Sequence, residues 1–244
     1  MDSTDAVIEA FTELAPSYEK TLDAEVRQMW GISYRQFVDQ FIATIPIQDG
    51  NDILDVATGT GVIPLRIAQR VSSQCRIVGL DITPAMLSYA QSAVQAAGLS
   101  SLIRTVCASG MAMPFGEGVF DVVTCGLGMH HMDGERLAQE MRRVLRPNGW
   151  LVMADVVASP VWRSFLGAIW FRALMVYFGI THRRSRFRAE MDALANLRTR
   201  GEWQELLGAC GFVDVHITRL PPRRRFYPDA LLIKARIQSP SGSG

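Results

Sequence analysis

The sequence predicts a doubly wound α/β fold: a mostly parallel sheet of seven strands, with N-terminal helices and a helical insertion. Three observations predict it. Short apolar runs of strand length alternate with helical patterns between residues 46 and 157. The first run ends in a glycine-rich turn that leads directly into a helix. After the insertion, two more apolar runs have the length and spacing of a closing antiparallel hairpin.

Composition restricts the class of protein. The chain has 244 residues, 48% of them hydrophobic and 20% charged, which is enough for one domain with a full core. A net charge of +1 gives no overall field that attracts nucleic acid, so none is expected as a partner. Four cysteines without C-x-x-C spacing predict reduced thiols in a cytoplasmic protein. The acidic N-terminus lacks the apolar core of a signal peptide.

Residues 1–45 are predicted to form a helical cap. Apolar side chains recur at helical spacing from Val7 to Tyr18, and again from Tyr34 to Ile42.

Residues 46–157 are predicted to form the core of the domain. The expected strands are 53–56, 76–80, 102–107, 120–125 and 150–157. The expected helices between them are 62–71, 84–98 and a segment around 137–145. Thr83 is predicted to cap the second of these helices, with Pro84 at its first position and Gly98 at its end.

Residues 158–200 interrupt the alternation. The segment 165–180 is almost entirely apolar and rich in aromatic residues, but it is shorter than the roughly 20 residues that a membrane-spanning helix needs. Two interpretations stay open: a mobile lid over a hydrophobic substrate, from about Pro160 to Arg188, or a buried core helix. Because the insertion follows the fifth strand, it lies near the strand ends where open α/β sheets bind ligands.

Residues 201–238 are predicted to close the single domain 1–238. A helix around Trp203 ends at Gly211, and strands at 213–220 and 227–235 form the hairpin. Residues 239–244 are a flexible tail. The sequence does not indicate the oligomeric state.

Two basic clusters, at 183–188 and 223–225, are interpreted first as solvated faces. The alternatives are weak contact with an anionic membrane surface or with an acidic substrate.

The turn at 55–61 is the most informative segment. Gly59 and Gly61 allow a tight turn in which backbone amides approach a ligand closely, and amides at a helix start favour an anionic group. Asp81 ends the second strand about 20 residues later, where a carboxylate accepts ribose hydroxyls. A dinucleotide site needs a third glycine where this chain has Pro64, so nicotinamide and flavin dinucleotides are not expected to bind.

These segments carry a resemblance to a known family. Residues 55–61 resemble motif I of class I S-adenosylmethionine-dependent methyltransferases, and residues 79–87 resemble the motif that follows it. Residues 114–115, 120–123 and 143–149 continue the match in order. The form of the turn is similar to the UbiE-like C-methyltransferases of ubiquinone and menaquinone synthesis. Further similarity to their N-terminal pattern lies at Phe11, Leu14, Ala15 and Tyr18, with Glu19 where that family has aspartate.

The resemblance, which covers residues 8–157 well, implies a class I methyltransferase Rossmann-like fold with S-adenosylmethionine as cofactor. The turn would meet the methionine part, Asp55 would anchor either the turn or the amino group, and Asp81 would hold the ribose. The expected cofactor-binding residues are Asp55, Ala57, Thr58, Gly59, Thr60, Gly61, Asp81, Ile82, Ser109, Gly110, Met111 and Gly126. Ser109 departs from the aspartate common in the family, although its hydroxyl can still accept a hydrogen bond from the adenine amine.

Three residues are candidates for catalysis. His130 and His131 follow the fourth strand, and a histidine there titrates near neutrality and could take a proton from a phenol, enol or amine. The alternative is that one of them caps the next helix or contacts only the cofactor. Tyr18 would close the pocket from the N-terminal helices. Because neighbouring side chains on an extended chain point apart, the two histidines are not expected to share a metal, and no metal is predicted.

The predicted function is transfer of a methyl group to a carbon or heteroatom of a mostly apolar small molecule. The resemblance favours a phenolic or enolic acceptor, prenylated or an intermediate of natural-product synthesis. Two rivals stay open. One is an enzyme that keeps the cofactor but catalyses another step, such as a cyclisation. The other is a non-catalytic binding protein, disfavoured because the turn at 55–61 and Asp81 are both intact.

Overall fold

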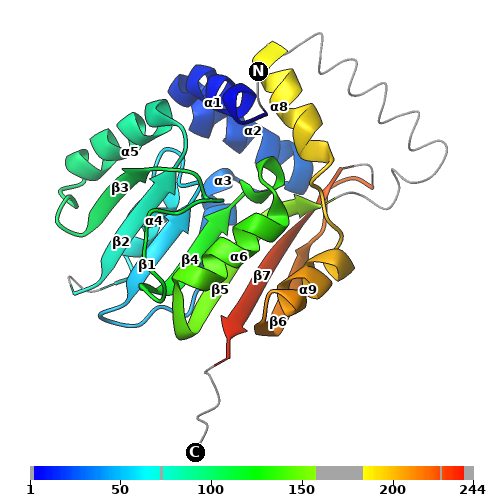
Figure 1. Ribbon diagram of the computed structural model, residues 1–244. Helices are drawn as coiled ribbons and strands as arrows, with labels where there is room; N and C mark the ends of the chain where they lie inside the picture. The colour runs from blue at the N-terminus through cyan, green and yellow to red at the C-terminus, as the bar shows by residue number, and fades with distance from the viewer. Residues whose placement is uncertain (1–2, 72–73, 158–183, 226, 239–244) are drawn as a thin grey trace, which may run out of the picture.

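The computed structural model describes residues 3–71, 74–157, 184–225 and 227–238. Within them lies one seven-stranded sheet in the order β3-β2-β1-β4-β5-β7-β6, which confirms the predicted doubly wound class (Figure 1). The strands are β1 (Asp52–Val56), β2 (Arg76–Asp81), β3 (Ile103–Cys107), β4 (Phe120–Gly126), β5 (Leu145–Val157), β6 (Phe212–Leu220) and β7 (Asp229–Ile237). Strands β1 to β5 run parallel, while β7 pairs antiparallel with both β5 and β6.

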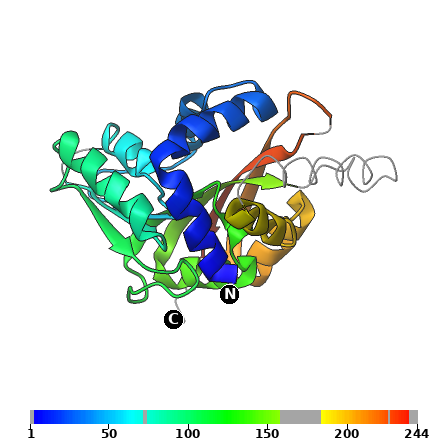
Figure 2. The same cartoon turned by 90° about the horizontal axis from the view of Figure 1, so that it is seen from above.

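Helices cover both faces of the sheet and its carboxyl edge. They are α1 (Ser3–Leu14), α2 (Tyr18–Trp30), α3 (Tyr34–Ala43), α4 (Val62–Ala68), α5 (Pro84–Ala96), α6 (Gly134–Val144), α8 (Arg184–Leu194) and α9 (Arg200–Ala209), with short 3-10 turns η1 (Ala15–Ser17) and η2 (Met129–His131). Helices α6 and α9 lie in front of the sheet in Figure 1. Helices α1 and α8 lie side by side above the strand ends, as both ribbon views show (Figures 1 and 2).

The core has two apolar layers because successive side chains on a strand point to opposite faces of the sheet. Leu54, Val123 and Met153 belong to the layer that includes α6 and α9. Their neighbours, Ile53 and Val122, belong to the layer that includes α3 and α4. Because both faces are covered, the central strands β1 and β4 are buried along most of their length, which is typical of a parallel sheet.

Two local predictions need correction. Thr83 stands at the N-cap position of α5, but its side chain makes no capping bond; the Asp81 carboxylate accepts from the Thr83 backbone N–H instead, at 2.8 Å. The fifth strand begins at Leu145 rather than Trp150. Leu145 pairs with Phe120 and Trp150 with Val122, so the intervening residues bulge out of the ladder around Asn148, whose φ is +63°.

The predicted apolar segment 165–180 lies outside the described residues, so the two interpretations of it stay untested. No helix among the described residues is long and apolar enough to cross a membrane. One member of the basic clusters is not a solvated arginine: Arg186 on α8 is mostly buried and pairs with Glu25 of α2.

Candidate active site

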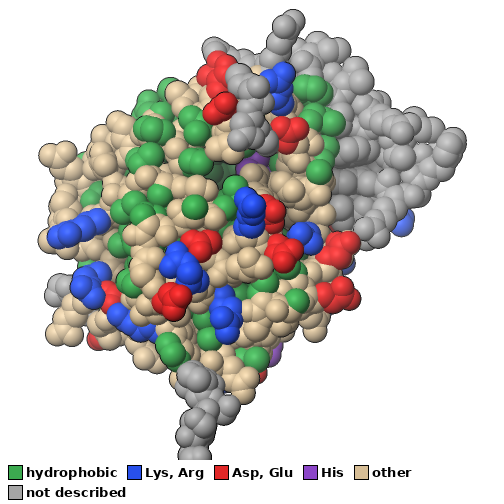
Figure 3. All heavy atoms as spheres, viewed as in Figure 1, with side chains coloured by type: hydrophobic (Ala, Val, Ile, Leu, Met, Phe, Trp, Pro, Cys, Tyr) green, Lys and Arg blue, Asp and Glu red, His purple; other side chains and the backbone are tan. Residues whose placement is uncertain are grey.

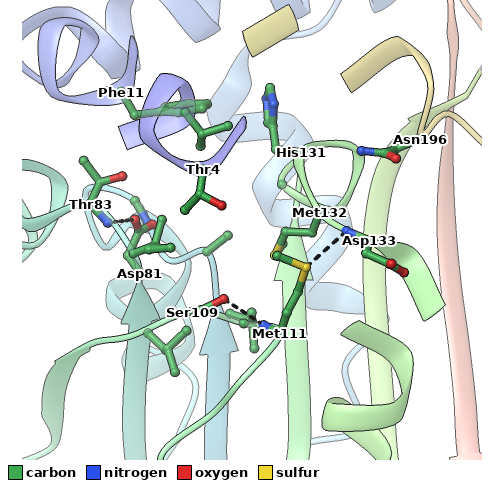
Figure 4. Close-up of a pocket in the computed structure, with 18 of the residues that line it drawn as sticks. Thr4, Phe11, Asp81, Thr83, Ser109, Met111, His131, Met132, Asp133 and Asn196 are labelled. Atoms are coloured by element: carbon green, nitrogen blue, oxygen red, sulfur yellow. Dashed lines mark hydrogen bonds between the residues drawn. The ribbon is translucent and has the colours of Figure 1, made fainter. Parts of the chain in front are cut away.

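A cavity of about 550 Å³ opens at the carboxyl ends of β1, β2 and β4, beneath α1. Figure 3 shows a hollow in this face with a histidine side chain at its wall, and Figure 4 shows the labelled lining residues. Its volume is typical of small-molecule sites. The predicted site residues that line it are Tyr18, Ala57, Gly59, Asp81, Ile82, Ser109, Gly110, Met111 and His131.

The glycine turn is held in shape by its own backbone and by Asp81. Gly59 and Gly61 have φ values of +55° and +83°, and Ala57, which is not glycine, has φ +55°. The Gly59 N–H donates to one Asp81 oxygen at 2.8 Å, and the Thr83 N–H donates to the other (Figure 4). Asp81 is therefore fixed at the cavity wall, where the remaining lone pairs of its carboxylate can accept ribose hydroxyls.

Asp55 lies beneath the turn and does not line the cavity. It is fully buried, and its two oxygens accept from the hydroxyls of Thr58 and Thr124, each at 2.7 Å. Burial raises the pKa of Asp55 to about 7, although both hydroxyl hydrogen bonds oppose the shift. Of the two roles predicted for it, the structure shows the anchoring of the turn.

Four other predicted cofactor residues shape the cavity from outside its lining. Thr58 belongs to the turn itself, and Gly61 packs against Ala90 of α5. The Thr60 hydroxyl donates to Glu19 at 3.0 Å. Gly126 does not line the pocket. A β-carbon there would lie 2.5 Å from the Ile63 side chain, so the absence of a side chain at this position allows α4 to pack closely against β4.

The start of α2 docks on the glycine turn. The Tyr18 ring lies 3.6 Å from where a β-carbon on Gly59 would stand, and Glu19 accepts the hydrogen bond from Thr60. Burial, with a smaller effect of Asp81, raises the pKa of Tyr18 well above its ordinary value, so the hydroxyl stays protonated. Tyr18 therefore covers the turn, and its protonated hydroxyl is not available as a base near neutral pH.

The loop after β4 brings the histidines to the cavity. Leu127 adopts φ +57°, and its N–H donates to Ala154 of β5 at 2.7 Å. A β-carbon on Gly128 would lie 2.7 Å from that of Ala57, so the loop packs directly on the glycine turn. Two non-glycine residues with left-handed backbone, Ala57 and Leu127, thus face one cavity, which is where such strain is usually found in functional sites.

His131 is the histidine that lines the cavity; His130 is not in the lining. The His131 ring packs edge-on against Phe11, with centroids 5.1 Å apart, and hydrogen-bonds to the backbone of Ala189. Its Nδ1 is buried and has no hydrogen-bond partner among the described residues. Burial, and then the neighbouring His130, lower the pKa of His131 well below its ordinary value, so the ring is neutral near pH 7.

His130 is bound to Asp155 of β5. Its Nδ1 lies 2.6 Å from one Asp155 oxygen, and its backbone N–H donates to the other at 2.8 Å. Burial by itself would lower the pKa of His130, but the Asp155 carboxylate outweighs it and raises that pKa.

The expectation that the two histidines point apart is wrong. They lie on the helical turn η2 rather than on an extended chain, and their ring centroids are 4.2 Å apart. With Glu190 of α8, they bring two ring nitrogens and one carboxylate oxygen within 4.8 Å of one another. The Arg186 guanidinium is 3.9 Å from the Glu190 carboxylate and provides a counter-charge.

Sequence reasoning missed part of the lining. The missed residues include Thr4, Val7 and Phe11 of α1, Leu127, Gly128, Met132 and Asp133 beside the histidines, and Asn196 and Arg198 before α9. Those near the histidines are predictable from the sequence, because they belong to the same loop after β4 as His130 and His131. Asn196 and Arg198 carry no signal in the sequence, since they reach the cavity only through the placement of α8.

Residues 109–111, which are predicted to contact the adenine, line the cavity. The Ser109 hydroxyl accepts from the Met111 N–H at 3.2 Å, and the Met111 sulfur accepts from the Asp133 N–H at 3.3 Å (Figure 4). Ser109 therefore retains its own O–H, which can donate to a molecule in the cavity.

The sheet order, the turn with its paired Asp81 and the cavity define an S-adenosylmethionine-dependent methyltransferase of class I. A family model agrees with this class: residues 2–220 match that of the ubiE/COQ5 methyltransferase family. The chain belongs to that family. It is 27% identical over 210 residues to the ubiquinone/menaquinone biosynthesis C-methyltransferase UbiE of Geobacter sulfurreducens, covering 84% of this chain and 79% of the relative.

Solved structures share the fold. Phosphoethanolamine N-methyltransferase 2 of Haemonchus contortus, in complex with S-adenosyl-L-methionine, has a TM-score of 0.65 at 13% identity, covering 85% of this chain and 53% of that one. The [4+2]-cyclase SpnF has a TM-score of 0.65 at 17% identity, covering 94% and 97%. S-adenosylmethionine is the cofactor of this enzyme family, and the turn, Asp81 and Ser109 fit it.

Proposed function

We propose that this enzyme methylates a carbon or oxygen of a mostly apolar small molecule whose reacting group must lose a proton, such as a phenol or enol. The relative's function in quinone synthesis favours a prenylated quinol and a carbon acceptor. Support comes from the apolar side chains of Val7, Phe11 and Met132, which belong to the cavity lining. A flat apolar ring would find apolar contact area there.

One observation carries the proposal: of the two candidate histidines, His131 is the one that lines the same cavity as Asp81 and Ser109. Its lowered pKa keeps the ring neutral near pH 7, which is the form that accepts a proton.

S-adenosylmethionine supplies an electrophilic methyl group when bound. The residues of this chain then have three tasks: Asp81, Gly59 and the residues of the turn orient the cofactor, α1 and Tyr18 exclude water, and His131 takes the acceptor's proton. Tyr18 remains protonated and cannot share the last task.

The test compares wild type with His131→Asn on two acceptors. The first is a reduced prenylated naphthoquinone; the second is a prenylated nitrophenol that is already ionised at the assay pH. Asparagine keeps the polarity of the position but does not accept a proton at neutral pH. We expect a loss of about 10²–10⁴-fold in kcat on the quinol, as for a removed general base, and a much smaller loss on the nitrophenol. Equal losses on both acceptors would rule out a base role for His131.

A further inference from the structure

Behind His131 lies a buried group of charged side chains that the proposed function does not use. It consists of His130 on η2, Asp155 on β5, and Glu190 and Arg186 on α8. We propose that Asp155, assisted by Glu190, is a positioning residue that fixes His130 and thereby holds His131, the proposed proton acceptor, in the wall of the cavity. This inference rests on the proposed function only for the role of His131.

Asp155 binds the backbone and the ring of the same residue. It is 1% exposed, and its oxygens accept from the His130 N–H at 2.8 Å and pair with His130 Nδ1 at 2.6 Å. The Val156 N–H adds a third donor at 2.8 Å. Binding both the main chain and the ring leaves His130 no rotational freedom about χ1.

The remaining polar group of the His130 backbone is also occupied. The Asn196 amide donates to the His130 carbonyl at 3.1 Å. His131, by contrast, is held by the Phe11 ring and by one hydrogen bond to the backbone of Ala189. The position of His131 therefore depends on its neighbour in the chain.

The charges around the pair favour one arrangement of protons. His130 lies between two carboxylates, Asp155 from β5 and Glu190 from α8. Burial lowers the pKa of His130, but the two carboxylates outweigh burial and raise it, which favours the protonated form of His130 next to His131. On the other side, Arg186 adds positive charge, and Glu25 of α2 neutralises part of it. A cation beside His131 keeps His131 neutral.

Replacing Asp155 by Asn removes the anion that favours protonated His130, so the pKa of His130 falls. His130 then loses its proton at a lower pH, so its positive charge opposes protonation of His131 over a narrower pH range. The pKa of His131 therefore rises. The two midpoints should therefore move toward each other in the variant.

The experiment is a ¹³C-histidine NMR titration of the full chain saturated with S-adenosylhomocysteine. The chain has four histidines, so the signals can be assigned with His130→Asn and His131→Asn. In wild type we expect His131 to titrate below, and His130 above, the ordinary midpoint of about 6.5. In Asp155→Asn the His130 midpoint should fall and the His131 midpoint rise, each by about one unit.

Two further variants keep the test decisive. Asp52→Asn is the control, because Asp52 is a buried carboxylate at the amino end of β1, away from the cavity, where it pairs with Arg76 and Arg146. It should leave both midpoints unchanged. Glu190→Gln is the alternative if Asp155→Asn does not fold, since Glu190 is partly exposed on α8; it should move both midpoints in the same directions, but less.

The outcomes separate the two proposals. Midpoints of His130 and His131 that stay at their wild-type values in Asp155→Asn or Glu190→Gln would overturn the positioning role. The NMR readout needs no acceptor, so failure of the quinol assay alone would count against the proposed function and not against Asp155. Where turnover is measurable, the acid limb of the kcat profile should shift to higher pH in Asp155→Asn, while Asp52→Asn keeps the wild-type profile.

Discussion

Replacing Asp81 by alanine should weaken cofactor binding and loosen the glycine turn together. Each Asp81 oxygen accepts a backbone N–H at 2.8 Å, from Gly59 and from Thr83, and the carboxylate is 8% exposed. Loss of charge-assisted bonds to a ribose is worth roughly 1.5–3 kcal/mol, which raises the Kd for S-adenosylhomocysteine about 10–150-fold. The unpaired N–H groups should cost a further ~1–3 kcal/mol of unfolding free energy each.

Asparagine at position 81 should recover little of this loss. Both carboxylate oxygens accept from N–H groups, whereas an amide offers one oxygen and one NH₂, so a donor would face a donor at either Gly59 or Thr83. Titration calorimetry with S-adenosylhomocysteine and urea unfolding measure the two effects separately. Asp52→Asn is the control and should lower stability without changing the Kd. Unchanged cofactor affinity in a folded Asp81→Ala protein would refute the assignment of Asp81.

Asp55 has a pKa of about 7 in the fold against about 4 unfolded, so its contribution to stability is present below pH 4 and is lost as pH rises through 7. The free energy of unfolding in urea should therefore fall over this range, by an amount on the order of 4 kcal/mol, in wild type but not in Asp55→Asn. An equal fall in the variant would contradict the raised pKa of Asp55. Gly128→Ala places a β-carbon 2.7 Å from that of Ala57 and should weaken S-adenosylhomocysteine binding. Gly208→Ala, which has open space around it on α9, should leave the affinity unchanged. Equal affinities of the two variants by calorimetry would show that the close packing of Gly128 on Ala57 is not needed for binding. NAD and NADP should give no thermal shift, because Pro64 occupies the place of the third dinucleotide glycine. A shift with either nucleotide would show that Pro64 does not exclude a dinucleotide.

Local patterns predicted the glycine turn and the acidic residue that stand together in the cavity wall. The turn at 57–61 and Asp81 are recognisable because a strand, a turn and a helix follow one another within a few residues, and the parallel sheet places their ends together. Asp55 was ambiguous from sequence, because only the packed structure shows its oxygens occupied by Thr58 and Thr124.

The acceptor end was less predictable. The orientation of His130 and His131 depends on the short helical turn η2, which no residue pattern indicated. Asp155 is 25 residues away from His130 in the chain and meets it only because β4 and β5 are neighbours. Asn196 reaches the cavity through the placement of α8, which depends on tertiary packing and not on any local motif.

The central claim is that this cavity transfers a methyl group from S-adenosylmethionine to a small apolar acceptor. Mass spectrometry with S-adenosylmethionine carrying a trideuterated methyl group tests it most directly, with a reduced prenylated naphthoquinone as acceptor. We expect one trideuteromethyl group in the product and one equivalent of S-adenosylhomocysteine for each product formed, both abolished in Asp81→Ala. A product that forms without S-adenosylhomocysteine would instead indicate a non-methylating step such as cyclisation, and would contradict the claim.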